Sequence, residues 1–133
     1  MTAFTLSSTV RRPFHRTLTD VREALAGQGF GILTEIDLQE TLKRKLDVDV
    51  PPETILGACR PSLAYRALQA EPSIATVLPC NVVVRSVDAE TTMVEAFDPY
   101  AMTSLAGTAA LDDVAAEARM RLTTALAVVE QEN

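Results

Sequence analysis

The alternation of two hydrophobic periods between Phe30 and Met102 most constrains what this chain can fold into. In some short segments, apolar side chains recur at about every second position, which is typical of strands. In the segments between them, apolar side chains recur every three or four positions, which is typical of helices. Prolines separate several of these segments, at positions 51, 52, 61 and 72. The pattern therefore predicts short strands connected by helices.

The whole chain gives the element order β-α-β-α-β-α-β-β-α. The expected strands are residues 4–10, 30–36, 54–59, 81–87 and 92–97. The expected helices open at 17–20, cover 38–46, extend from 61 to Pro72 and close the chain over 111–129. A chain of 133 residues has the usual size of one domain. We therefore expect a single α+β domain over residues 1–133, in two layers, with helices on one face of a five-stranded sheet.

Two of the expected helices carry clear local signals. Asp37 and Glu40 have the spacing of a capping box at the start of the 38–46 helix. The closing helix has one apolar stripe, made of Leu111, Val114, Ala115, Ala118, Leu122, Ala125, Leu126 and Val129. Asp113, Glu117 and Arg121 fall on its other side, where we expect a solvated charged stripe.

Both faces of the predicted sheet carry apolar side chains. The face that we expect against the helices collects Phe30, Ile32, Ile36, Ile55, Val82, Val84, Val94 and Ala96. The opposite face collects Leu33, Glu35, Leu56, Ala58, Arg60, Val83, Arg85, Val87, Met93, Glu95 and Phe97. More than half of this second set is apolar, which is typical of an interface rather than of a solvated surface.

We expect this second face to form a homodimer interface. Its predicted contact residues are Leu33, Leu56, Val83, Arg85, Met93 and Phe97. Two alternatives remain open. In the first, the face is covered within the same chain, by the closing helix or by the 98–110 segment. In the second, the face binds a ligand.

Charge and hydropathy argue against nucleic acid and membranes as partners. The net charge is −6, and only Lys43 and Lys45 are lysines, whereas phosphate-backbone binding needs clustered basic residues. No apolar run reaches the roughly 18 residues that span a bilayer. The first residues, MTAFTLSSTVRR, lack the pattern of a signal peptide. We therefore expect a cytoplasmic protein whose cysteines are reduced.

The usual catalytic arrangements are missing from the sequence. His15 is the single histidine and lies beside Arg12 and Arg16, so we expect a surface residue between a strand and a helix. A Cys/His zinc site and a nucleophile–histidine pair both need more histidines in suitable places. No glycine-rich phosphate loop occurs. We predict no catalytic residue, and the sequence identifies no cofactor.

The two cysteines are the strongest candidates for chemistry. Cys59 ends one predicted strand and Cys80 begins the next, and a right-handed helical crossover between them is expected to set these strands side by side. Met102 follows Asp98-Pro99 near the same sheet end. Two thiolates and a thioether suit Cu(I) or another thiophilic ion. Free cysteines also occur as inert core residues, which is the outcome that we expect for this pair. A reactive or redox-active thiol is the other alternative.

No pair of carboxylates has an obvious catalytic arrangement, but Glu35 and Asp37 share a strand end and a side of the strand. They are candidates for a small hydrolase or isomerase pocket beneath the closing helix. A helix-capping role explains Asp37 better, and we favour it.

Four sequence segments together resemble domain-of-unknown-function family 302: Glu35-Ile36-Asp37, Gly57-Ala58-Cys59-Arg60-Pro61, Leu78-Pro79-Cys80-Asn81-Val82-Val83-Val84 and Asp98-Pro99. The resemblance covers about residues 4–110. It implies a small cytoplasmic α+β domain of bacteria or archaea that forms a homodimer, and it supplies no reaction, cofactor or catalytic residue. The chain departs from the family pattern at Arg60, where asparagine is more usual, and at Leu38, where a histidine often follows the aspartate.

These observations favour a non-enzymatic binding or interaction domain that dimerises through its sheet. The first alternative is a soft-metal or redox protein that uses Cys59 and Cys80. The second and weaker alternative is a hydrolase or isomerase that uses Glu35 and Asp37.

Overall fold

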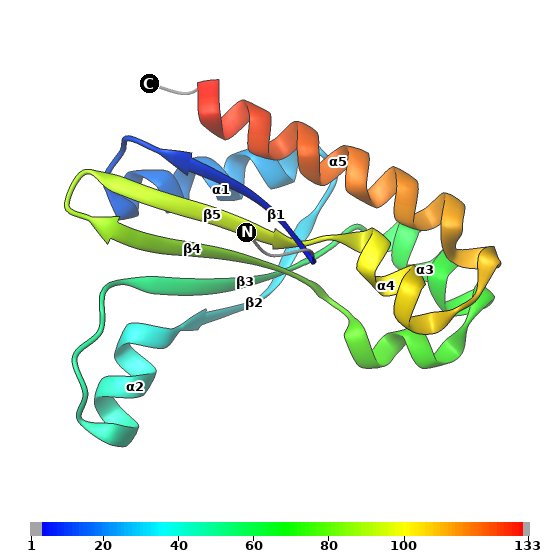
Figure 1. The fold of residues 1–133 in the computed structure, drawn as a ribbon, viewed down its shortest axis with the longest axis horizontal. Helices are drawn as coiled ribbons and strands as arrows, with labels where there is room; N and C mark the ends of the chain where they lie inside the picture. The colour runs from blue at the N-terminus through cyan, green and yellow to red at the C-terminus, as the bar shows by residue number, and fades with distance from the viewer. Residues whose placement is uncertain (1–3, 132–133) are drawn as a thin grey trace.

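The computed structural model describes residues 4–131 and contains five strands within this range (Figure 1). The strands are β1 (Thr5–Val10), β2 (Gly31–Asp37), β3 (Glu53–Cys59), β4 (Cys80–Asp88) and β5 (Thr91–Phe97). The α-helices are α1 (Phe14–Gly27), α2 (Leu38–Leu46), α3 (Pro61–Ala70), α4 (Pro99–Ala106) and α5 (Asp112–Gln131). Two short 3-10 helices are η1 (Pro72–Val77) and η2 (Ala109–Leu111).

The strands form one sheet in the order β1-β5-β4-β3-β2, and every neighbouring pair is antiparallel. The α+β class and the five-stranded sheet are therefore confirmed, and the predicted element order matches apart from one additional helix, α4. The sequence prediction placed the start of the first helix too late, because α1 begins at Phe14. It also missed α4, although Asp98 is its N-cap and Pro99 is its first residue, a common start signal.

The main core lies between the sheet and two helices, α1 and the second half of α5. Leu18, Val21 and Leu25 of α1 pack with Leu122 and Leu126 of α5 and with the inward side chains of β3, β4 and β5. The predicted apolar stripe of the closing helix is confirmed, since all of its residues are buried. The stripe positions recur every three or four residues, so they share one side of the helix.

A second hydrophobic cluster lies at one end of the sheet. Leu63 and Ala67 of α3, Ile74 of η1 and Met102 of α4 meet the first half of α5 there, as Figure 1 shows at the right of the molecule. The helix α5 therefore joins both clusters.

The predicted side-chain directions of β3 are wrong. Leu56 and Ala58, expected on the outer face, are fully buried on the helix side. The reason is the register with β4: Leu56 lies opposite Val82, and Ile55 lies opposite Val83. Directly opposed residues point to the same face of a sheet, and Val82 belongs to the main core.

A β-bulge reverses the second half of β2. The register with β3 shifts between Ile32 and Thr34, so Leu33 is the extra residue. Beyond it, Glu35 lies opposite Leu56 on the helix side, and Ile36 lies opposite Ile55 on the outer side. The predicted faces of Glu35 and Ile36 were therefore the wrong way round.

Candidate functional site

One face of the sheet points away from α1 and α5, and we call it the uncovered face. In Figure 1, α1 lies behind β5 and β4, and no helix lies in front of these two strands. Strand register assigns to this face Thr5, Ser7, Thr9, Thr34, Ile36, Glu53, Ile55, Asn81, Val83, Arg85, Met93, Glu95 and Phe97. None of these residues is fully buried, and five of them have apolar or thioether side chains: Ile36, Ile55, Val83, Met93 and Phe97.

An ion-paired arginine occupies the centre of the uncovered face. The Arg85 side chain donates from Nε to Glu53 Oε2 at 3.2 Å and from Nη2 to Glu95 Oε1 at 3.0 Å. Its Nη1 contacts Met93 Sδ at 3.2 Å, and Glu95 also accepts from Thr5 Oγ1 at 2.8 Å. The hydrogen bond to Glu95 is the main cause that raises the pKa of Arg85 above its ordinary value. Arg85 is therefore held flat against the strands by partners from both neighbouring strands.

The structure divides the six predicted interface residues. Val83, Arg85, Met93 and Phe97 lie on the uncovered face and are partly accessible. Leu33 is 66% exposed in the bulge of β2. Leu56 is a correction, because it lies at 0% exposure on the opposite side and belongs to the main core.

A groove of about 500 Å³ hollows one end of the uncovered face. Val83 and Phe97 form its floor, and Leu105 of α4, which is 76% exposed, lies at its rim. Its full lining is Phe4, Thr5, Thr76, Val77, Leu78, Pro79, Asn81, Val83, Glu95, Ala96, Phe97 and Leu105. The 98–110 segment therefore flanks the face at this end and does not cover its centre. Sequence reasoning missed this groove because it missed α4.

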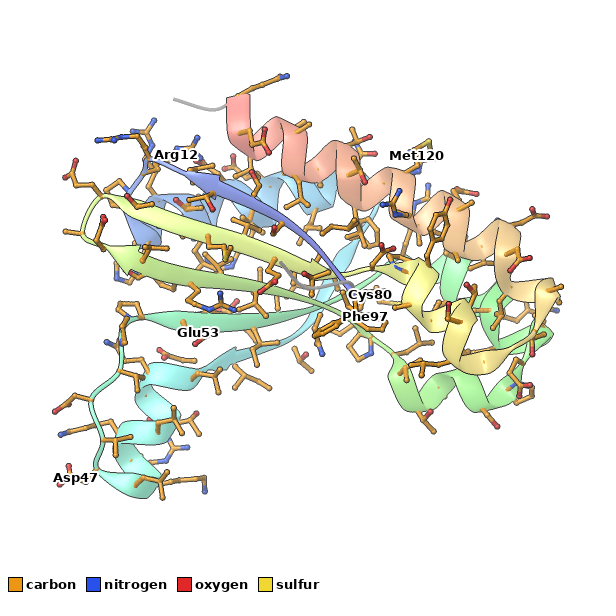
Figure 2. The ribbon with its side chains drawn as sticks, in the orientation of Figure 1. Arg12, Asp47, Glu53, Cys80, Phe97 and Met120 are labelled. Atoms are coloured by element: carbon orange, nitrogen blue, oxygen red, sulfur yellow. The ribbon has the colours of Figure 1, made fainter. Side chains whose placement is uncertain are left out.

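Cys59, Cys80 and Met102 line a second, smaller cavity of about 30 Å³ on the helix side of the sheet end. Figure 2 shows Cys80 where the sheet approaches α4. The other lining residues are mostly apolar: Phe30, Ala58, Arg60, Leu63, Ala64, Ala67, Leu78, Pro79, Val114 and Ala118. The three sulfur-bearing residues predicted from the sequence are thus brought to one place.

The antiparallel pairing of β3 and β4 is what brings the thiols together. The prediction that these strands are neighbours is confirmed, with Ala58 opposite Cys80. The expected right-handed crossover is wrong, because that rule concerns parallel strands. In a parallel pair, the end of β3 and the start of β4 would lie at opposite ends of the sheet. In the antiparallel pair they meet.

Both cysteines are free and half-buried. Burial raises the pKa of the Cys80 thiol to about 11, and repulsion from Cys59 contributes to the same direction. A thiol with such a pKa stays protonated at neutral pH and reacts slowly as a nucleophile. The expectation of inert cysteines stays a prediction.

A charged cluster lies beside this cavity and meets it at Arg60. Arg60 donates from Nε to the Gln28 carbonyl at 3.0 Å and from Nη1 to Ser62 Oγ at 2.9 Å. Glu117 of α5 lies 3.5 Å from Arg60, 3.2 Å from Arg66 and 3.7 Å from Arg121. Glu117 therefore links α3 to α5 and is not the simple solvated charge that the sequence suggested.

The two candidate carboxylates have structural partners. Glu35 accepts from Arg22 Nε at 3.2 Å, and Asp37 Oδ1 accepts from the backbone amide of Glu40 at 3.0 Å. Asp37 is thus the N-cap of α2, as favoured from the sequence. Both carboxylates are exposed, and neither lines the groove or the thiol cavity. His15 is exposed in the first turn of α1.

Over residues 4–131, no group of three or more His, Cys, Asp or Glu side chains has the geometry to hold a metal ion. In the same range, no helix has the length and apolar character that crossing a membrane requires.

Comparisons with known proteins identify the family. A search among curated proteins found no match. The chain is similar to a solved structure described as an uncharacterized conserved protein DUF302 from Bacillus stearothermophilus, with 28% sequence identity and a TM-score of 0.87. The match covers 96% of this chain and 98% of that one. Residues 6–129 also match the family described as "Domain of unknown function DUF302". With nearly its whole length matched and the fold shared, this chain belongs to the DUF302 family.

Proposed function

We propose that this chain is a non-enzymatic binding domain that joins a second copy of itself through the uncovered face. The observation that carries the proposal is the composition of this face, on which partly accessible apolar side chains surround the Glu53–Arg85–Glu95 ion pairs. Partly exposed apolar side chains that are grouped on one face and bordered by polar residues often mark a contact with another molecule.

A second copy fits this face because the face is complementary to itself. A two-fold interface places the same patch on both sides, so the patch must contain both halves of each interaction. Here, Arg85 lies beside Glu53 and Glu95, so charges of both signs are present. The groove and the exposed side chain of Leu105 likewise supply a hollow and a projection on the same surface.

The dimensions of the sheet also support a dimer. Five strands at about 4.8 Å and about six residues at roughly 3.3 Å give a flat footprint of roughly 24 Å by 20 Å. The groove walls and Leu105 enlarge this footprint. Stable interfaces cover about 800 Å² of accessible surface on each partner, which is a comparable scale for a rough surface.

The positions and partners of the candidate catalytic residues support the non-enzymatic part of the proposal. His15 is exposed on α1, far along the chain from both cysteines, while Glu35 and Asp37 are engaged by Arg22 and by the start of α2. The two reduced thiols fit a reducing compartment such as the cytoplasm.

Val83→Glu tests the dimer. Val83 lines the groove on β4 and lies opposite Glu95, so a carboxylate there adds a second negative charge beside Glu95 within the proposed interface. We expect the parent protein to sediment as a dimer at micromolar concentration and Val83→Glu to sediment as a monomer. Val128→Glu is the matched control, because Val128 is 37% exposed on α5, away from the uncovered face. This control should remain dimeric.

A parent protein that sediments as a monomer over the micromolar range would overturn the proposal. So would a Val83→Glu variant that stays dimeric with unchanged helical content by circular dichroism.

A further inference from the structure

The small cavity beside β3 and β4 is lined by sulfur-bearing side chains from three separate elements. Cys59 ends β3, Cys80 begins β4 and Met102 lies in α4, yet all three line the same 30 Å³ space. Strand register also brings the two cysteines close, because Cys80 lies opposite Ala58, the residue before Cys59. Local structure does not require Met102 to lie near Cys80, because the β4–β5 hairpin and the start of α4 separate them along the chain.

From this convergence we infer that Cys59, Cys80 and Met102 form a binding site for a monovalent soft metal ion, Cu(I). Thiolate and thioether sulfur are soft ligands, which suit Cu(I), zinc and iron–sulfur clusters. The site is independent of the proposed dimer, because it lies on the helix side of the sheet and not on the uncovered face.

The surroundings match this ion better than a divalent one. Apart from Arg60, the cavity walls are apolar, so they offer no carboxylate, hydroxyl or imidazole ligand. Structural zinc needs four ligands, usually cysteine or histidine. Two thiolates with one neutral thioether are too few for zinc, whereas Cu(I) accepts two or three sulfur ligands.

The size of the cavity also permits occupation without repacking. A space of roughly 10–15 Å³ by this measure already holds one water molecule. The observed 30 Å³ is therefore enough for a bare metal ion among the residues that line the cavity.

The charge balance is simple. Binding removes one proton from each thiol, so Cu⁺ and two thiols give a dithiolate complex of net charge −1 and release two protons to solvent, with no change in oxidation state. Arg60 lies at the cavity, is held by Gln28 and Ser62, and also lies 3.5 Å from Glu117, so its positive charge is shared between that carboxylate and the complex. This guanidinium offsets part of the negative charge.

The test uses the reduced full-length protein and Cu(I) alone, titrated without oxygen against a coloured Cu(I) chelator. We expect one Cu(I) per chain. Cys59→Ala and Cys80→Ala should each weaken binding by at least about 100-fold, and Met102→Leu by about 10-fold, because each removes a direct ligand. Met120→Leu is the matched control: Met120 is 53% exposed on the outer side of α5 (Figure 2), so its thioether should not matter.

A second measurement separates loss of a ligand from loss of folding. Cu(I) should raise the melting temperature of the parent and of Met120→Leu, because binding to the folded state stabilises it. Cys80→Ala should melt cooperatively without metal and show no such rise. A parent that cannot compete with the chelator would overturn the inference. Equal Cu(I) affinities of Cys80→Ala and Met120→Leu, or one ion for every two chains, would overturn it as well.

Discussion

At Cys80, the physical chemistry of a single side chain makes stability depend on pH. Its thiol lies at the end of the sheet among apolar neighbours, where the charged form is poorly solvated. Burial, with a contribution from Cys59, raises its pKa from 9.0 to about 11. In the unfolded chain the thiol returns to its ordinary value. The folded state therefore keeps a proton over a range of pH in which the unfolded state loses it.

We predict that the parent protein loses stability relative to Cys80→Ala as the pH rises from 9 to 11. Below the unfolded pKa, both states of the parent are protonated and the advantage of the neutral thiol is complete. Between the two pKa values, the folded state holds more protons than the unfolded state, so the free energy of unfolding falls as pH rises. A shift of about two units corresponds to about 2–3 kcal/mol in total.

Urea denaturation of both proteins at about pH 8 and about pH 10.5 measures this difference. Other groups that titrate in this range are common to both proteins, so the difference reports Cys80. A constant gap between the two stabilities across this range would show that the thiol is not shielded from water.

At the scale of elements, the sequence predicted which segments are strands but not always which way their side chains point. Ile55 and Leu56 are adjacent and both apolar, so period-two reasoning had no means of choosing between them. The pairing with β4 decides it, and this pairing is a tertiary contact. Similarly, the bulge at Leu33 leaves no mark in the residue types of β2, although it reverses Glu35 and Ile36.

Gly57 shows how tightly these strands meet. A Cβ atom added there would lie 2.1 Å from Thr34 Oγ1 and 2.8 Å from Pro79 Cγ. Both distances are far below ordinary contact, so Thr34 of β2 and the Pro79 ring before β4 would have to move. We predict that Gly57→Ala destabilises the protein by about 1–3 kcal/mol through overpacking.

Gly27→Ala is the matched control, because a Cβ there meets nothing within 4 Å. Gly27 is the last residue of α1, so alanine should be neutral or stabilising by up to about 1 kcal/mol. Thermal and urea unfolding of both variants measures the contrast. Equal midpoints for Gly57→Ala and Gly27→Ala would mean that β2 and β3 have room to separate.

For the whole molecule, the sequence predicted the two-layer arrangement and the gathering of the thiols, but not the groove. The two layers follow from the hydrophobic periodicity within each segment. The apolar stripe of the closing helix is long enough to be recognised in the sequence. The groove instead depends on α4, η1 and the strand ends, which are distant in sequence and meet only in the folded chain.

The stripe of α5 also has a consequence for folding, because its first half belongs to one hydrophobic cluster and its second half to the other.

This bridging by α5 predicts that both hydrophobic clusters unfold together. Leu122 is buried in the main core, and Leu63 is buried in the second cluster. We expect Leu122→Ala and Leu63→Ala each to cost about 2–5 kcal/mol and to lower the midpoint of one common transition.

Two spectroscopic probes report on different parts of the chain. Its two tyrosines, Tyr65 in α3 and Tyr100 in α4, report on the second cluster, whereas circular dichroism reports on all helices. In urea, tyrosine fluorescence and circular dichroism should give the same midpoint in the parent and in both variants, which is the requirement for two-state unfolding. If Leu63→Ala shifted the fluorescence midpoint alone, the second cluster would unfold by itself, and α5 would not couple the two.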